Sequence, residues 1–265
     1  MAFVIMRAPP RIECPDPPLA RDAPAGGTDS LTAHGRLRYS GSEIPAHAMS
    51  QPLIAPTLLF RFAAPCRHTE QRWSSKGLSL DERYALPCFS QLHGAKTFAD
   101  LRMGWNEAGL ALDLIVRGKQ QAPWCRDSRI DDSDGLQLWI DTRNTQNIHR
   151  AGRFCHRFAF LPVGGGGRAD EPAAVLLAIN RAKESPREID PRQLKVAAQR
   201  LADGYRLTGF LPAEALTGYS PSDQPALGFT YAVLDRELGC QTFSVGPEFP
   251  FAEDPSLWGT LDLVR

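Results

Sequence analysis

The chain has 265 residues, which is enough for one large domain or two small ones. Its 30 basic and 30 acidic residues balance, so no global field attracts nucleic acid or an anionic membrane, and we expect neither as a partner. The 22 Pro and 22 Gly separate many short apolar runs, a pattern typical of strands joined by turns and not of long helices. We therefore predict an all-β chain.

The N-terminal segment, residues 1–50, is dominated by Pro, Gly, Ser, Ala and Arg and shows no sustained hydrophobic period. We predict a flexible or loosely docked Pro-rich arm there and a single domain over residues 51–265. The uninterrupted apolar run Ala2–Met6 is too short for a signal-peptide core, and no later run reaches membrane-spanning length. We expect a cytoplasmic protein; this becomes extracellular if the natural start lies further upstream.

The first predicted strand lies around Thr57–Ala63, and its prolines indicate either a position at a sheet edge or the flanks of the strand. A clearer hairpin spans Leu101–Val116, where alternating apolar residues flank the turn residues Asn106–Gly109. We expect its two strands in the middle of a sheet. Trp105, beside the turn, is either a ligand platform or an indole that caps the core.

The most informative stretch is Ala122–Arg143, APWCRDSRIDDSDGLQLWIDTR, in which Trp124 stands beside a proline in a polar loop. In the strand that follows, leucines and an isoleucine alternate with Gln137, Trp139 and Asp141. Such alternation is typical of a strand with one face on the core and the other toward solvent or a ligand. An indole, an amide and a carboxylate on the second face would suit a sugar. Alternatively, Trp139 packs under a loop and Trp124 fills a gap.

The next strand, Phe154–Leu161, places His156 in line with two phenylalanines and Arg157 on the opposite face. We interpret His156 as a hydrogen-bonded core histidine. The run Val163–Arg168, VGGGGR, lacks the Lys-Ser/Thr signature of a phosphate loop and indicates a hairpin end. The remaining elements predicted from the residues are strands at Ala173–Arg181, Leu194–Gln199 and Tyr205–Leu211, with a short helix at Pro212–Leu216.

The six cysteines are widely spaced and fit no zinc-ribbon or C-x-x-C pattern, so we expect mostly buried free thiols. The pairs Cys66/His68 and Cys155/His156 would offer four soft ligands if their strands were neighbours. Adjacent residues on one strand point to opposite faces, however, and we therefore predict no metal site.

No catalytic arrangement stands out. G-x-S-x-G is absent, and Asp131, Asp132 and Asp134 lie in one loop and do not face a second carboxylate across a cleft. We therefore expect a binding domain that is not an enzyme and needs no cofactor. The three aspartates could hold a calcium ion. A solvated acidic loop is the alternative that we prefer.

Four segments in chain order resemble elements of the family-9 carbohydrate-binding modules, a β-sandwich group related to the DOMON-like domains. They are LRMGWNEAGLALDLIV at Leu101–Val116, PWCRDS with DGLQLWIDTR within Pro123–Arg143, GFTYAVLD at Gly228–Asp235 and DPSLWGTLDLV at Asp254–Val264. The resemblance implies an antiparallel β-sandwich with short helical turns. It also implies noncatalytic binding of a mono- or oligosaccharide.

The same resemblance implies a set of site residues. Trp124 matches the loop tryptophan that stacks on the sugar ring, and Gln137 stands where the family has a glutamate that accepts hydroxyl hydrogen bonds. Arg157 is the counterpart of an arginine that reaches the sugar, and Phe251 stands near the family's second sandwiching tryptophan. The alternative is a cytoplasmic protein that uses the sandwich for protein contacts, with residues 1–50 as a docking arm.

Overall fold

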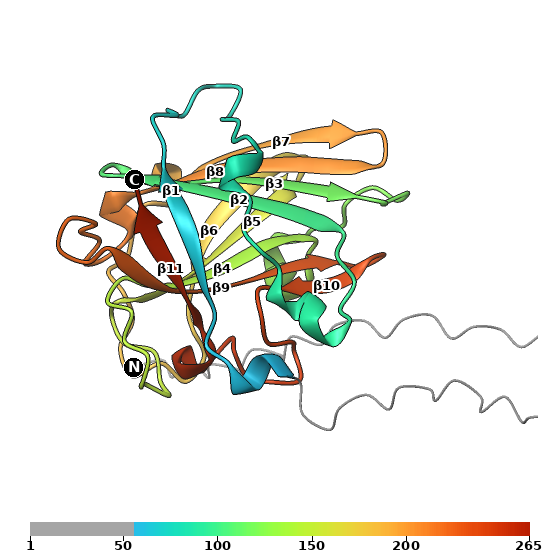
Figure 1. The fold of residues 1–265 in the computed structure, drawn as a ribbon. Coiled ribbons are helices and arrows are strands. Elements are labelled where there is room, and N and C mark those ends of the chain that lie inside the picture. Colours follow the sequence, from blue (N-terminus) through green and yellow to red (C-terminus); the bar gives the residue numbers. More distant parts are fainter. Residues whose placement is uncertain (1–55) are drawn as a thin grey trace, which may run out of the picture.

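The computed structural model describes residues 56–265, so the predicted N-terminal arm and the boundary at residue 50 lie outside the described residues. Its strands are β1 (Ala63–His68), β2 (Ala99–Asn106), β3 (Gly109–Arg117), β4 (Gly135–Asp141), β5 (Cys155–Gly165), β6 (Glu171–Leu177), β7 (Lys195–Leu201), β8 (Gly204–Pro212), β9 (Ala226–Asp235), β10 (Gly239–Thr242) and β11 (Gly259–Val264) (Figure 1). The helical segments of the described chain are short 3-10 turns: η1 (Pro56–Leu59), η2 (Glu82–Tyr84), η3 (Phe89–His93), η4 (Asp127–Asp132), η5 (Pro191–Gln193), η6 (Ala213–Ala215) and η7 (Pro255–Leu257). This confirms the all-β prediction. Within the same residues, no helix is long and apolar enough to cross a membrane.

The strands form one curled sheet in the order β6-β5-β4-β9-β11-β1-β2-β3-β8-β7, and β10 pairs with β9 outside this path. The two terminal strands, β6 and β7, approach each other, and β5 also packs against β8. The sheet therefore folds back into two facing layers, a nearly closed sandwich (Figure 1). All strand pairs except those of β1 are antiparallel.

The predicted hairpin is present as β2 and β3, with the register running from Ala99 opposite Val116 to Asn106 opposite Gly109. It lies inside the sheet, between β1 and β8, as predicted. Trp105 is only 4% exposed, and its Nε1 donates to the Val264 carbonyl at 3.1 Å. Trp105 therefore caps the core and is not a ligand platform.

The predicted bounds of the first strand are wrong, and of the two positions considered for its prolines the sheet edge is excluded. The segment begins with the turn η1, and β1 starts only at Ala63. The strand also lies between β11 and β2, parallel to both, and not at an edge. Pro65 is tolerated there because β2 pairs with β1 only at Arg67 and His68, so the sheet has an open side beside the proline.

The later predicted strands correspond to β6, β7, β8 and β9, and the predicted short helix corresponds to η6. The glycine run ends the β5–β6 hairpin, as expected from its lack of a phosphate-loop signature. His156 is fully buried, and its Nε2 accepts a hydrogen bond from the Thr217 amide at 2.9 Å. This confirms the hydrogen-bonded core histidine.

The core lies between the two layers. Leu138 and Phe158 from one layer and Leu112 and Leu207 from the other are all fully buried. Burying side chains of this size contributes roughly 1.5–3 kcal/mol each. The layers approach closely at Gly209, where a Cβ atom would lie 2.6 Å from Cε1 of Phe160. Only glycine leaves room for that ring.

The outer face of β4 is closed as well. Gln137 and Asp141 are each 2% exposed, and Trp139 is fully buried. The expectation that this face meets solvent or a ligand is therefore wrong. Alternation shows which residues share a face, but it does not show which loop covers that face.

Candidate functional site

Trp139 packs under a loop of the chain. Its Nε1 donates to the Ala252 carbonyl at 3.1 Å, and its ring meets Phe251 edge-on at a centroid distance of 5.4 Å. Trp258 completes this cluster and donates from Nε1 to the Phe251 carbonyl at 2.7 Å. Phe251 is 2% exposed, so its ring serves this buried cluster and offers no open face to a ligand.

Gln137 and Arg157, two of the predicted site residues, are in direct contact. The Arg157 guanidinium donates to Gln137 Oε1 from Nε at 3.2 Å and from Nη2 at 2.6 Å. It also forms an ion pair with Asp131 of η4 and lies 5.2 Å from the centroid of the Trp139 ring. Burial lowers the pKa of Arg157, and the charge of Asp131 opposes this effect. The contact fastens η4 onto β4 and β5.

The acidic loop is not a solvated loop throughout. Asp131 pairs with Arg157, Asp132 with Arg129 and Asp134 with Lys119, each with a different cation. Asp134 is fully buried, which contradicts the preferred interpretation for this residue. Within residues 56–265, no group of three or more His, Cys, Asp or Glu side chains is arranged to hold a metal ion.

Asp134 instead organises a corner of the protein. Its Oδ2 accepts a hydrogen bond from the Trp124 amide at 2.9 Å, and its Oδ1 accepts one from the Arg236 amide at 2.8 Å. Lys119 Nζ lies 3.0 Å from the same carboxylate. One buried side chain therefore brings together two segments that are far apart in the sequence. We call Trp124, Arg126 and Arg236 the Trp124 corner.

The Trp124 indole is partly exposed at this corner. The guanidinium carbons of Arg236 and Arg126 lie over its ring, at 4.3 and 5.1 Å from the centroid. The loop is fixed from below, because the Arg126 amide donates to Ser133 Oγ at 2.9 Å. The backbone of the corner is therefore held in place, while its aromatic and cationic side chains reach the surface.

The protein's five tryptophans differ sharply in access to solvent. Trp105, Trp139 and Trp258 are buried, and each donates its Nε1 proton to a backbone carbonyl. Trp73 and Trp124 are the two that are partly exposed. Gln137, Arg157 and Phe251 are buried, so Trp124 is the one predicted site residue that offers surface to a ligand.

Sequence reasoning missed the buried cation of this corner. Lys119 Nζ lies 2.9 Å from Asp235 Oδ1 as well as close to Asp134. Burial lowers the pKa of Lys119, but its hydrogen bonds with Asp235 and Asp134 outweigh burial and leave this pKa raised. Burial also raises the pKa of Asp235, against the effect of Lys119. Asp235 ends a predicted strand, whereas no sequence pattern marks Lys119.

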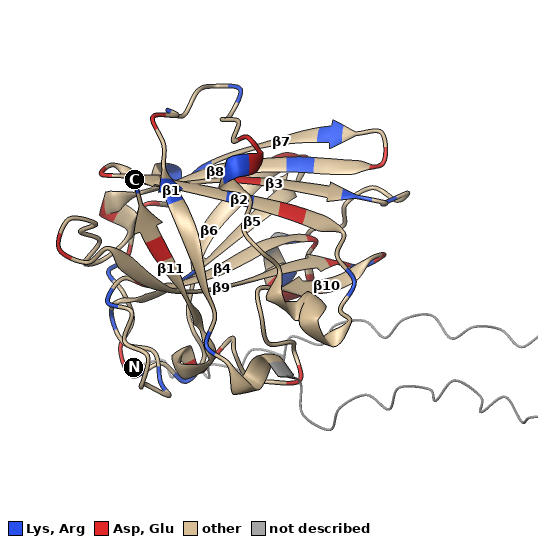
Figure 2. Cartoon of the chain, viewed as in Figure 1, with Lys and Arg blue, Asp and Glu red and all other residues tan. Residues whose placement is uncertain are grey.

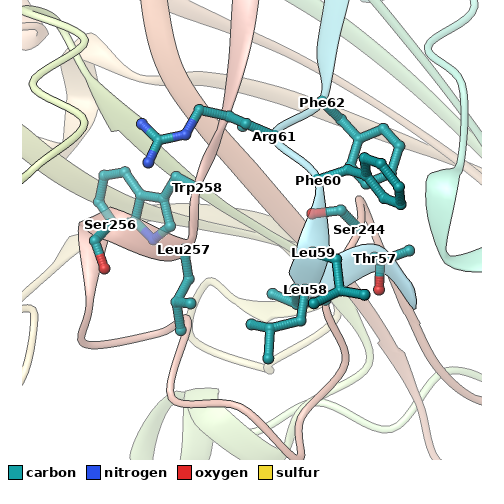
Figure 3. Close-up of a pocket in the computed structure, with 12 residues that line it drawn as sticks. Thr57, Leu58, Leu59, Phe60, Arg61, Phe62, Ser244, Ser256, Leu257 and Trp258 are labelled. Atoms are coloured by element: carbon teal, nitrogen blue, oxygen red, sulfur yellow. The ribbon is translucent and has the colours of Figure 1, made fainter. Parts of the chain in front are cut away.

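A separate hollow of about 220 Å³ lies beside η1 and η7. In Figure 3 the Arg61 side chain extends over Trp258, while Phe60 and Phe62 lie on the opposite side. Leu59 and Phe60 are 69% and 65% exposed. None of the four predicted site residues lines this hollow. Elsewhere on the described chain, basic and acidic residues are interspersed over strands and loops (Figure 2).

No family model matches the chain, and no curated protein matches its sequence. Two solved structures are similar in fold, both of a carbohydrate binding module of family 9 from Caldicellulosiruptor kristjanssonii. The complex with cellotriose is 12% identical with a TM-score of 0.53, covering 77% of this chain and 94% of that chain. The complex with glucose is 13% identical with a TM-score of 0.50, covering 77% of this chain and 97% of that chain. The chain thus has the fold of the family-9 carbohydrate-binding modules, as its four segments predicted.

Proposed function

We propose that this protein is a noncatalytic sugar-binding β-sandwich that recognises a mono- or oligosaccharide at the Trp124 corner. The observation that carries the proposal is the partly exposed Trp124 indole, fixed at a loop corner by the buried Asp134. An indole face covers the C–H surface of a sugar ring, and neighbouring polar groups bind its hydroxyls. The similar modules were solved with cellotriose and with glucose, which supports the same ligand class here.

In this proposal the four predicted site residues have different roles. Trp124 contacts the sugar. Gln137 and Arg157 hold η4, through Asp131, in the position from which the neighbouring loop presents Trp124. Phe251 supports the covered face of β4 through Trp139. The last three are positioning residues, since each is less than a tenth exposed.

A glycan array followed by calorimetric titration tests this proposal. The intact chain should bind a subset of glycans, and glucose and cellotriose are the first soluble ligands to titrate. Trp124→Ala should weaken binding by about 5- to 150-fold, since aromatic stacking contributes roughly 1–3 kcal/mol per ring. Trp73→Ala, which alters the other partly exposed tryptophan, is the matched control and should bind normally. An intact chain that binds no glycan at millimolar concentrations would contradict the proposal.

A second candidate function is protein interaction, which the exposed Leu59 and Phe60 favour. Large apolar side chains grouped beside a hollow are typical of contact surfaces. A partner that uses this surface would present an apolar segment. A Leu59→Ser, Phe60→Ser double variant should then lose the partner in a pull-down while keeping any sugar binding. Retention of the partner by this variant would remove the candidate.

A further inference from the structure

The charged side chains that the structure describes around Trp124 have polar or charged partners, with two exceptions. Each acidic side chain that the structure describes in this region already has a partner: Asp131 has Arg157, Asp132 has Arg129, Asp134 and Asp235 share Lys119, and Glu237 accepts from the amides of Gln120 and Gln121. These contacts account for three of the cations. They leave no described carboxylate near the corner without a donor.

Arg126 and Arg236 are the exceptions. Both residues are exposed, and within residues 56–265 neither guanidinium forms an ion pair or a hydrogen bond with a described side chain. Their contact at the corner is the Trp124 ring, over which both lie. Two cations without an ion-pair partner among the described side chains therefore lie over the partly exposed indole of the proposed binding site.

The position of these cations is built into the fold. The Arg236 amide is bound by Asp134 at 2.8 Å, and the Arg126 amide is bound by Ser133 at 2.9 Å. Asp134 and Ser133 are both buried, so the backbone at each arginine is anchored while its side chain remains at the surface. A ligand would meet two guanidiniums whose backbone positions are already fixed. Only the two side chains would then need to become ordered on binding.

From this arrangement we propose that the Trp124 corner selects sugars that carry an anionic group, either a uronate carboxylate or a sulfate ester. The inference rests on the proposed function and names the ligand class of the same site. The indole supplies the stacking surface, and a guanidinium offers paired N–H donors that match the oxygens of a carboxylate or sulfate. A sugar ring that stacks on Trp124 would displace an exposed arginine side chain from the indole face. The guanidinium of that arginine would remain close enough to pair with the anionic group of the sugar.

Matched monosaccharides test the inference by calorimetric titration of the intact chain at low salt. Glucose, glucuronic acid and glucose 6-sulfate share one ring and differ in charge, and the last two separate the carboxylate from the sulfate. We expect at least one anionic sugar to bind about tenfold tighter than glucose, with the advantage shrinking at high salt. An Arg126→Gln, Arg236→Gln double variant should bind the anionic sugars no more tightly than it binds glucose, whatever its affinity for glucose. Arg200→Gln on β7, another exposed arginine, should change nothing.

The outcomes distinguish a preference for anionic sugars from sugar binding itself. Equal affinity for the neutral and anionic sugars would overturn the charge preference and leave sugar binding at Trp124 intact. A preference that survives in the double variant would also overturn it, because the charge would then be read elsewhere. Failure of the intact chain to bind any of the three sugars, or any glycan on the array, would contradict the proposed function itself.

Discussion

Trp124 and Trp139 come from one short stretch of sequence but end in opposite environments. Trp139 on β4 is fully buried, bound through Nε1 and packed edge-on against Phe251. Trp124, in the loop before that strand, is partly exposed beneath two guanidiniums. An aromatic residue on the polar face of a strand is therefore not necessarily a ligand-binding residue. What covers the face decides its role.

The largest loss of stability is expected from replacing Trp139, the buried member of this pair. Trp139→Ala should lower the free energy of unfolding by about 3–5 kcal/mol, since the cavity left by a buried indole cannot refill completely. Urea unfolding measures this change. Trp124→Ala is the matched variant, and we expect a loss of less than about 1 kcal/mol for this more exposed ring. Similar losses for both tryptophans would contradict the assigned environments.

A comparable loss is expected at the buried cation beneath the Trp124 corner. Lys119→Met leaves Asp134 and Asp235 buried without their shared cation, and breaking a buried ion pair in this way costs about 3–5 kcal/mol. It should also weaken sugar binding, because Asp134 anchors both Trp124 and Arg236. Urea unfolding and titration of the same variant test both expectations. Wild-type stability in Lys119→Met would show that the cation is dispensable.

The next prediction concerns the pH dependence of stability that the buried His156 on β5 causes. Burial lowers the pKa of His156 from 6.5 to about 4. Between pH 6.5 and 4, His156 therefore binds a proton more readily in the unfolded chain than in the folded one. The stabilisation of the folded state that depends on neutral His156 is thus fully present above pH 6.5 and is lost as the pH falls toward 4. The shift corresponds to about 3 kcal/mol. His156→Gln should remove this part of the pH dependence.

Urea unfolding of both proteins at several pH values between 7 and 4 measures the difference. Glutamine keeps an acceptor for the Thr217 amide, so the variant separates titration from the lost hydrogen bond. Parallel stability curves for the wild type and the variant would show that His156 is not the group that titrates.

The smallest effect on stability belongs to the Trp124 corner, where the effect on binding is what counts. Stacking on an indole contributes roughly 1–3 kcal/mol, so Trp124→Ala should weaken sugar binding by about 5- to 150-fold. Trp124→Phe should recover part of this loss, because a smaller ring still covers the sugar. Full affinity in Trp124→Ala would place the ligand elsewhere.

The local pattern predicted much of the fold. The β2–β3 hairpin follows from alternation and turn residues that lie close together in the sequence, and β9 from the resemblance of Gly228–Asp235 to a strand of the modules. The position of β1 does not, since its parallel partners β11 and β2 are set by distant segments. The four-residue strand β10 was not predicted either, because it is too short to show a period.

In the candidate site, too, some contacts can be predicted from the sequence and others cannot. Gln137 and Arg157 were both expected in the site, and the antiparallel pairing of β4 and β5 brings them into contact. The approach of Arg236 to Trp124 depends on Asp134, which joins residues more than a hundred positions apart. No spacing rule in the sequence encodes that contact. Loop coverage of Trp139 was likewise invisible to alternation.

The most direct measurement is an NMR titration of the intact chain, following the indole Nε1–H signals of its five tryptophans. Trp124→Phe identifies the Trp124 signal, and glucose and glucuronic acid are the titrants. Sugar binding at the corner predicts a saturable shift of the Trp124 signal, while the signals of the three indoles with bound Nε1 protons stay in place. A stationary Trp124 signal in the presence of a bound sugar would contradict the account.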